Sequence, residues 1–318
     1  MHIGIHTGLG GHFGMGHAVR CKTLASALVA QGADVEFLTQ TPALAAFVAP
    51  LPCHLYRHVW PAWPIEVVVE DVPCQSPDAW YALLRQRYRV VRVDVPTATP
   101  KTCDLLIAPC AHWHPDVVQG LSAAFGDRLL YGWDYVLLDE AVTQMPPVRY
   151  GLRVDGPVVF CAGGSDPTHA LERMALWMGE AVQDREWMAL VPAYGGPRDL
   201  PVWMKVVPFA RDWLREAALI VTTWGVTVYE ALWFGTPLCT VTAMAARMAD
   251  AQHCALASGH ALVSLGNLGC LDACLFAATV TDLAGLPRQR ARMHEASRGL
   301  LDGKGAQRAA SAILALED

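Results

Sequence analysis

The residues best suited to chemistry stand where apolar runs of the chain end. His17 follows a stretch, residues 8–16, in which five of nine residues are glycine. A helix is predicted to begin there, and a helix N-terminus favours the neutral imidazole that a general base requires. Arg20 lies one helical turn further on, where it is placed to hold an anion or to orient the histidine. His17 is therefore a candidate base, with capping or packing as its alternative role.

Two acidic residues are reserve candidates for the base. Asp71 and Asp94 each stand at the predicted C-terminal end of an apolar strand. Open α/β sheets place their ligands at this end of the strands. Gly16, the last glycine of the glycine-rich stretch, lets a ligand approach the backbone closely and is a candidate binding residue.

A second glycine-containing turn lies in the other half of the chain. Gly163, Gly164 and Ser165 follow an apolar run, and Pro167 is expected at the first turn of a helix with Ser165 or Asp166 as its cap. Unpaired backbone amides at such a helix start bind anions. The alternative is an ordinary tight connection between a strand and a helix.

A third segment, residues 222–232, repeats the order of strand, short turn and helix. Gly225 and Thr227 offer amide and hydroxyl groups to a diphosphate, with Trp224 and Val226 beside them. Glu230, one turn into the helix, can accept hydrogen bonds from both hydroxyls of a ribose on its two carboxylate oxygens. Taken alone, Glu230 would be a solvated helix residue.

Strands that alternate with helices predict parallel, doubly wound sheets. In the first half we expect strands at residues 3–6, 33–38, 65–69, 90–95 and 105–108, and helices at 17–31 and 79–88. In the second half we expect strands at 158–162, 187–191, 205–207, 219–222 and 238–241, and helices at 168–183 and 227–234. A linker is expected across residues 140–156, where two consecutive prolines interrupt the pattern. The prediction is an N-terminal domain, 1–145, and a C-terminal domain, 146–318, whose helical end, 286–316, returns to brace the first.

Composition limits the class of protein. The 318 residues are 53% hydrophobic, and charged side chains or prolines interrupt each apolar run before the roughly 20 residues of a membrane helix. The first residues resemble a strand rather than a signal peptide, and we expect a cytoplasmic protein without a membrane span. A net charge of −6 gives no general attraction to nucleic acid, so a small-molecule substrate is favoured.

The sequence predicts neither a metal nor a cofactor. Ten cysteines include no C-x-x-C pair, which is typical of buried thiols in a reducing cytosol. Cys103, Cys110, His112 and His114 lack the spacing of standard zinc ligands. The glycine-rich stretch is not a clean dinucleotide fingerprint, because Thr39 and its neighbours provide no acidic residue at the end of the second strand.

Six ordered blocks, which span almost the whole chain, resemble the GT-B nucleotide-sugar enzymes. The resemblance is to the lipid-linked N-acetylglucosaminyltransferase of peptidoglycan synthesis, and more to the UDP-sugar hydrolase of pseudaminic acid biosynthesis and its spore-coat-polysaccharide relatives. The blocks are GHAVRC at 16–21, LLYGWDYVLL at 129–138, GGSDP at 163–167, PFARDW at 208–213, WGVTVYE at 224–230 and DGKGA at 302–306. The resemblance implies two Rossmann-like domains facing a cleft.

The resemblance also implies roles for single residues. His17 matches the family's general base, Phe209 belongs to the block beside the nucleotide base, and the block that ends at Glu230 binds diphosphate and ribose. The segment that contains Asp250 and Gln252 reaches the sugar. The chain departs from the hydrolases at Val72, where they have tyrosine, and at Ala251, where they have asparagine. These departures favour an acceptor other than water.

The expected function is transfer of a sugar from a nucleoside diphosphate, a uridine one by preference, to a hydroxyl or amine, without a metal. Three alternatives stay open: a nucleotide-sugar hydrolase, a non-catalytic sugar-nucleotide-binding subunit, and a transferase acting on modified DNA bases. The last would need a basic surface, for which the candidates are Arg20, Lys22, Arg85, Arg87 and Arg89. The sugar, the acceptor and the oligomeric state are not specified by these patterns.

Overall fold

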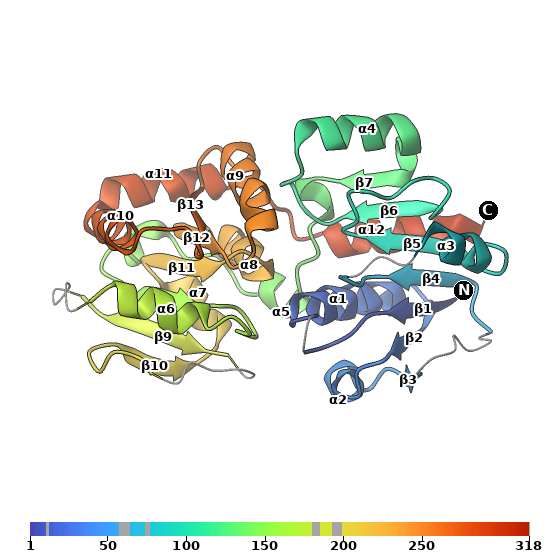
Figure 1. The fold of residues 1–318 in the computed structure, drawn as a ribbon, viewed down its shortest axis with the longest axis horizontal. Helices are drawn as coiled ribbons and strands as arrows, with labels where there is room; N and C mark the ends of the chain where they lie inside the picture. Colours follow the sequence, from blue (N-terminus) through green and yellow to red (C-terminus); the bar gives the residue numbers. More distant parts are fainter. Residues whose placement is uncertain (11–12, 57–63, 74–76, 180–184, 193–198, 318) are drawn as a thin grey trace. The chain divides into compact units, whose positions relative to one another are not determined.

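A computed structural model describes residues 1–10, 13–56, 64–73, 77–179, 185–192 and 199–317. The chain divides into two compact units (Figure 1). Unit 1 comprises residues 1–140 and 302–318, and unit 2 comprises residues 141–301. The C-terminal segment therefore belongs to the same unit as the N-terminus.

Unit 1 is built on a parallel sheet of seven strands in the order β3-β2-β1-β4-β5-β6-β7. The strands are β1 (His2–His6), β2 (Asp34–Thr39), β3 (Cys53–Leu55), β4 (Val67–Glu70), β5 (Arg89–Val93), β6 (Leu105–Ala108) and β7 (Leu129–Tyr131). The order reverses direction between β1 and β4, which pair in register from Ile3 with Val67 to His6 with Glu70. The loops on the two sides of such a switch point run in opposite directions, and this leaves room for a ligand between them.

Helices cover both faces of this sheet. They are α1 (Gly16–Ala30), α2 (Ala43–Val48), α3 (Asp78–Leu84), α4 (Pro115–Phe125) and α12 (Gly305–Leu314), with α5 (Glu140–Thr143) where the chain passes to unit 2. Buried Ile3 and Ile5 of β1 share one core with Leu24 of α1 and Ile313 of α12. On the opposite face, Tyr81 of α3 donates a hydrogen bond to Glu70.

Unit 2 repeats the design with six parallel strands in the order β10-β9-β8-β11-β12-β13. The strands are β8 (Val158–Cys161), β9 (Trp187–Val191), β10 (Lys205–Pro208), β11 (Leu219–Thr223), β12 (Leu238–Thr242) and β13 (Leu262–Asn267). The helices are α6 (Ala170–Trp177), α7 (Arg211–Glu216), α8 (Val226–Phe234), α9 (Met248–Ala257), α10 (Ala273–Gly285) and α11 (Pro287–Ser297). Its core joins β8 residues such as Phe160 to Met174 of α6 and Phe276 of α10.

The structure confirms the predicted strands to within two residues at each end. Three strands were not predicted: β3 and β7, which are short, and β13, whose register shifts beside Thr240 and Val241 of β12. The helix expected over residues 286–316 is wrong as one element, because α11 and α12 are separate and lie in different units. Within the described ranges, every helix is too short or too polar to cross a membrane.

The start of α12 is packed against main chain. A Cβ built on Gly305 would collide with the carbonyl oxygen of Val136. We predict that Gly305→Ala destabilises unit 1 by about 1–3 kcal/mol, the range for overpacking a tight contact. Urea unfolding measures this change.

Gly120 of α4 is the matched control, because it is exposed and a Cβ there would meet nothing within 4 Å. Gly120→Ala should stabilise the protein by about 0.5–1 kcal/mol through helix propensity. Helix propensity alone favours alanine at both positions, so a stabilised Gly305→Ala protein would contradict the packing described.

Candidate functional site

His17, Arg20 and Asp71 form one hydrogen-bonded group in unit 1. His17 and Arg20 lie on α1, and Asp71 directly follows β4. The Nδ1 atom of His17 lies 2.6 Å from Oδ1 of Asp71. Arg20 donates from Nε to Oδ2 of Asp71 at 2.5 Å and from Nη2 to Oδ1 at 2.6 Å. The bidentate pair fixes the carboxylate, and the carboxylate fixes one edge of the imidazole.

The contacts define which nitrogen of His17 can accept a proton. Nη2 of Arg20 also lies 3.2 Å from Nδ1, but an unprotonated Nδ1 that accepted from it would place two acceptors, Nδ1 and Oδ1 of Asp71, only 2.6 Å apart. We therefore assign the Nδ1 proton to the short bond with Asp71. The lone pair of the neutral ring is then on Nε2, and 19% of the His17 side chain is exposed to solvent. An imidazole whose other nitrogen is held in this way by a buried carboxylate can act as a general base.

The protonation state of Asp71 follows from its partners. Burial alone would raise the pKa of this fully buried carboxyl, but the charge of Arg20 and the hydrogen bonds from Arg20 and His17 outweigh burial and hold the pKa well below its ordinary range. Burial lowers the pKa of Arg20, and the charges of Asp71 and Asp94 overcome this effect and raise it. The two groups therefore form a permanent ion pair at neutral pH.

Both reserve candidates for the base, Asp71 and Asp94, accept hydrogen bonds from Arg20. Both oxygens of Asp71 accept hydrogen bonds, and its side chain has no exposed surface, so it lacks the access and basicity of a base. Asp94 accepts from Nη1 of Arg20 at 2.9 Å and is 9% exposed. The role that fits Asp71 is to orient His17, which the sequence reasoning did not assign to it.

Glycines set the backbone conformation of the described part of the loop before α1. Gly10 and Gly14 have φ of +77° and +64°, in the region that favours glycine. The loop is closed by hydrogen bonds from the amide of Gly10 to the carbonyl of Gly14 and from that of Phe13 to the carbonyl of Gly10. Phe13 meets the ring of His17 edge-on, with centroids 6.1 Å apart. Gly16 begins α1, and residues 11–12 lie outside the described ranges.

In unit 2, two of the predicted turns lie side by side. Strands β8 and β11 are neighbours, so the turns that follow them leave the same edge of the sheet. A Cβ built on Gly163 would lie 3.5 Å from Oγ1 of Thr227. Gly225 precedes α8, and the first amides of that helix, those of Val226 and Thr227, have no partner within it. The pair of turns thus presents backbone amides at one place.

The start of α6 differs from the prediction. The helix begins at Ala170, so Pro167 is not in its first turn. Asp166 accepts hydrogen bonds from the amides of Ala170 and Leu171 at 2.8 and 2.9 Å. Its carboxylate therefore occupies the place of an anion at this helix start. Anion binding at the Gly163, Gly164 and Ser165 turn would depend on the amides of the turn, not on α6.

Glu230 is buried rather than solvated. Its side chain is 5% exposed, and Oε1 accepts from Nε of Arg211 at 3.1 Å. Arg211 begins α7, directly after the segment that contains Phe209, and its side chain is 27% exposed. The sequence reasoning missed Arg211, although it stands within the PFARDW block. The hydrogen bond from Arg211 fixes the direction of this buried carboxylate.

The remaining predicted residues follow other strands of the same sheet. Phe209 comes directly after β10 and donates its amide hydrogen to Val191 at the end of β9. Trp224 follows β11, and its ring packs against Tyr229 with centroids 6.2 Å apart. Asp250 and Gln252 lie on α9, after β12; Asp250 pairs with Arg247 at 3.0 Å, and Gln252 is exposed. All four therefore lie beyond the C-terminal ends of parallel strands.

The basic surface required for nucleic acid is weakened by internal pairing. Arg20 is bonded to two aspartates, and Arg85 donates to Asp104 at 2.5 Å. Lys22 donates to the carbonyl oxygen of Phe47. Three of the five cations named for that alternative thus have partners within the protein.

Comparison with known proteins agrees on the fold. No model of a protein family matches the chain, and no curated protein is similar to it at a significant level. Among solved structures, the chain is similar to the glycotransferase of kitacinnamycin (TM-score 0.68, 14% identity, 99% of this chain and 98% of that one). It is also similar to Arabidopsis thaliana UGT89C1 in complex with UDP (TM-score 0.66, 12% identity, 99% of this chain and 99% of that one). A third similar structure is a UDP-N-acetylglucosamine 2-epimerase (TM-score 0.61, 15% identity, 99% of this chain and 95% of that one).

These similarities cover nearly the whole chain at low identity and therefore concern its fold. The two parallel α/β units and these neighbours define the GT-B fold. The prediction of that fold is confirmed. The nearer resemblance to the hydrolase of pseudaminic acid biosynthesis stays a prediction.

Asp71 gives a test of the ion pair through stability. The pKa of Asp71 is lower in the folded protein than in the unfolded chain, where it is about 3.9. The ionised carboxylate therefore stabilises the fold at pH values above about 3.9, and this contribution is lost as the pH falls from there toward the pKa of the folded state. We predict that Asp71→Asn lowers the free energy of unfolding by about 3–5 kcal/mol at pH 7, the range for breaking a buried pair. Urea unfolding at several pH values should show the difference from wild type narrowing below pH about 4.

Exposed Asp34 supplies the control, since Asp34→Asn should change stability little at any pH. A deficit in Asp71→Asn that stayed constant down to pH about 2 would show that the charge of Asp71 is not what stabilises the fold.

Proposed function

We propose that this protein transfers a sugar from a nucleoside diphosphate, a uridine one by preference, to a hydroxyl or amine acceptor. The observation that carries the proposal is the imidazole of His17, held through Nδ1 by buried Asp71 while Nε2 is left to take a proton. The GT-B fold supports it, because the similar structures include a glycotransferase, a protein in complex with UDP and an epimerase named for a UDP-sugar.

The donor site belongs to unit 2. The amides of Val226 and Thr227 at the start of α8, with those of the neighbouring Gly163–Ser165 turn, would bind the diphosphate. Glu230, fixed by Arg211, would accept hydrogen bonds from the ribose hydroxyls. Phe209 and Trp224 would border the base, and Asp250 and Gln252 would reach the sugar.

The chemical step is a displacement at the anomeric carbon. The acceptor oxygen or nitrogen forms a bond to that carbon while its proton passes to Nε2 of His17. The bond between the carbon and the diphosphate oxygen breaks, and the diphosphate leaves with the electron pair. Asp71 stabilises the imidazolium that forms, and the amides of unit 2 stabilise the charge that develops on the leaving group.

Product analysis tests the reaction class. Purified protein is incubated with a panel of UDP-sugars, with and without hydroxyl and amine acceptors, and released UDP and free sugar are measured separately. We expect UDP release that rises with acceptor and a sugar found on the acceptor. Free sugar released at a rate independent of every acceptor would make the protein a hydrolase, and no turnover with tight UDP binding would make it a binding subunit.

Glu230 tests the donor site. We predict that Glu230→Ala weakens UDP binding by about 1.5–3 kcal/mol, because a charged acceptor of ligand hydrogen bonds is removed. Isothermal titration calorimetry measures the affinity, and Glu216→Ala on α7, whose side chain is 50% exposed, is the control. Equal affinity in the Glu230→Ala and control proteins would mean that Glu230 only anchors Arg211.

His17 tests the base. We predict that His17→Asn lowers kcat by about 10²–10⁴, the usual contribution of a positioned base. The affinity for UDP should stay nearly unchanged, because the donor residues belong to unit 2. Steady-state kinetics and calorimetry on the same preparation separate the two quantities.

His260→Asn is the matched control, since His260 is exposed and its φ of +65° suits asparagine. Near-normal turnover of His17→Asn would place the base elsewhere.

Hard metal ions have no assigned part in this mechanism, since amides and a helix N-terminus balance the diphosphate charge. We predict that adding Mg²⁺ or Mn²⁺ to chelator-treated protein gives no gain in the rate of UDP release. A gain of tenfold or more with either ion would show that the diphosphate is bound through a metal.

A further inference from the structure

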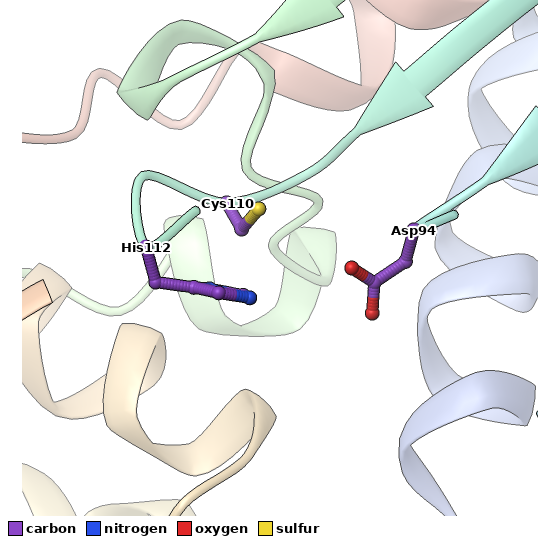
Figure 2. A group of neighbouring side chains, drawn as sticks. All are labelled: Asp94, Cys110 and His112. Carbon is purple, nitrogen blue, oxygen red and sulfur yellow. The ribbon is translucent and has the colours of Figure 1, made fainter. Parts of the chain in front are cut away.

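Three potential metal ligands converge beyond the C-terminal ends of β5 and β6. These strands are parallel neighbours, paired from Val91 with Leu105 to Val93 with Ile107. Asp94 directly follows β5, and Cys110 and His112 follow β6 by two and four residues. One carboxylate oxygen, the thiol sulfur and one imidazole nitrogen all lie within 4.8 Å of one another (Figure 2). The thiol and the imidazole point toward the carboxylate.

The backbone fixes the positions of Asp94 and Cys110. Asp94 has φ of +59°, a left-handed conformation that is uncommon outside glycine, and its amide donates to the carbonyl of Ile107 at 2.8 Å. The amide of Cys110 donates to the carbonyl of Ala108, and the carbonyl of Cys110 accepts from the amide of Gly132 at 3.0 Å. Cys110 and His112 are 2% and 5% exposed. The three donors are therefore part of a buried, ordered region rather than a surface cluster.

The donor types match one class of ion. We propose that Asp94, Cys110 and His112 bind a zinc-class divalent transition-metal ion. Thiolate and imidazole favour such ions, whereas Mg²⁺ and Ca²⁺ require oxygen ligands. Ligand atoms on a tetrahedral zinc ion lie roughly 3.3–3.8 Å apart, given bonds of about 2.0–2.3 Å, so a small closing movement of the side chains would complete the site. Three protein ligands leave a fourth position for water or a substrate atom.

The surrounding charges also fit. A thiolate and a carboxylate supply two negative charges to the divalent ion, and the positive charge of Arg20 is balanced by Asp71. Arg20 donates to Oδ2 of Asp94, so this ligand would be held by an outer hydrogen bond, as metal-binding carboxylates commonly are. An ion bound here would be linked through Asp94, Arg20 and Asp71 to His17.

The sequence could not predict this site from ligand spacing. Cys110 and His112 are separated by one residue, and the third ligand comes from a different strand 16 residues earlier. Among the residues that the structure describes, neither Cys103 nor His114 joins the group, although both were considered as ligands. Pairing of β5 with β6 brings Asp94 into place.

Cobalt titration of the metal-free full-length protein tests the proposal without relying on its activity. Co²⁺ replaces zinc and gives a sulfur-to-cobalt charge-transfer band when a thiolate is a ligand. We expect one Co²⁺ per chain, a charge-transfer band, and its loss on adding Zn²⁺. Cys110→Ser should abolish the band, and His112→Gln and Asp94→Asn should each weaken Co²⁺ binding at least tenfold.

One control variant and one alternative measurement make the outcome decisive. Exposed Cys270 and Cys274 are the competing thiols, so the double variant Cys270→Ser, Cys274→Ser should keep the band. A band that is kept in Cys110→Ser overturns the proposal, as does a wild-type protein that gives no band. If Cys110→Ser does not fold, X-ray absorption of the zinc-loaded wild type decides: one sulfur with nitrogen and oxygen ligands supports the site, and a shell without sulfur overturns it.

Discussion

The buried carboxylate of Asp71 is the interaction on which the geometry of unit 1 depends. It lies just beyond β4, at the point where the strand order reverses, and accepts hydrogen bonds from three residues of the facing helix α1, which are His17, Arg20 and Cys21. A buried carboxylate without partners would be strongly destabilising, so the positions of His17 and Arg20 on α1 are fixed by the need to pair it. The same bonds that satisfy the charge leave the imidazole in one orientation.

A comparable constraint organises unit 2 with different residues. Glu230 is a buried carboxylate on the first turns of α8, and Arg211 from α7 holds it. Asp166 is a third buried carboxylate, but it binds the amides of α6 and so removes that helix start from ligand binding. Two helix starts that look alike in sequence therefore differ in chemistry. The carboxylate of Asp166 binds the first amides of α6, whereas no side-chain carboxylate of the described residues caps the start of α8.

The sequence predicted the fold well because the central strands are long, apolar and separated by clear helical segments. The short strands β3 and β7 were not predicted, because a strand of three residues shows no periodicity. Strand β13 was not predicted, because Ser264 and Gly266 interrupt its apolar pattern. The site was predicted in part. His17 and Arg20 share a helix and could be related by spacing, whereas the contact of His17 with Asp71 spans 54 residues and depends on the pairing of β1 with β4. Arg211 was missed for the same reason, since its partner lies 19 residues away on another helix.

The placement of α12 has a consequence for how the chain folds as it is synthesised. Ala306, Ala309, Ala310 and Ile313 complete the core of unit 1, yet they emerge from the ribosome only after all of unit 2. Unit 2 is continuous in sequence and can close as soon as its own last helix is made. Unit 1 must wait with the apolar face of α1 uncovered until α12 arrives. The half of the chain that is made first is therefore the half that finishes folding last.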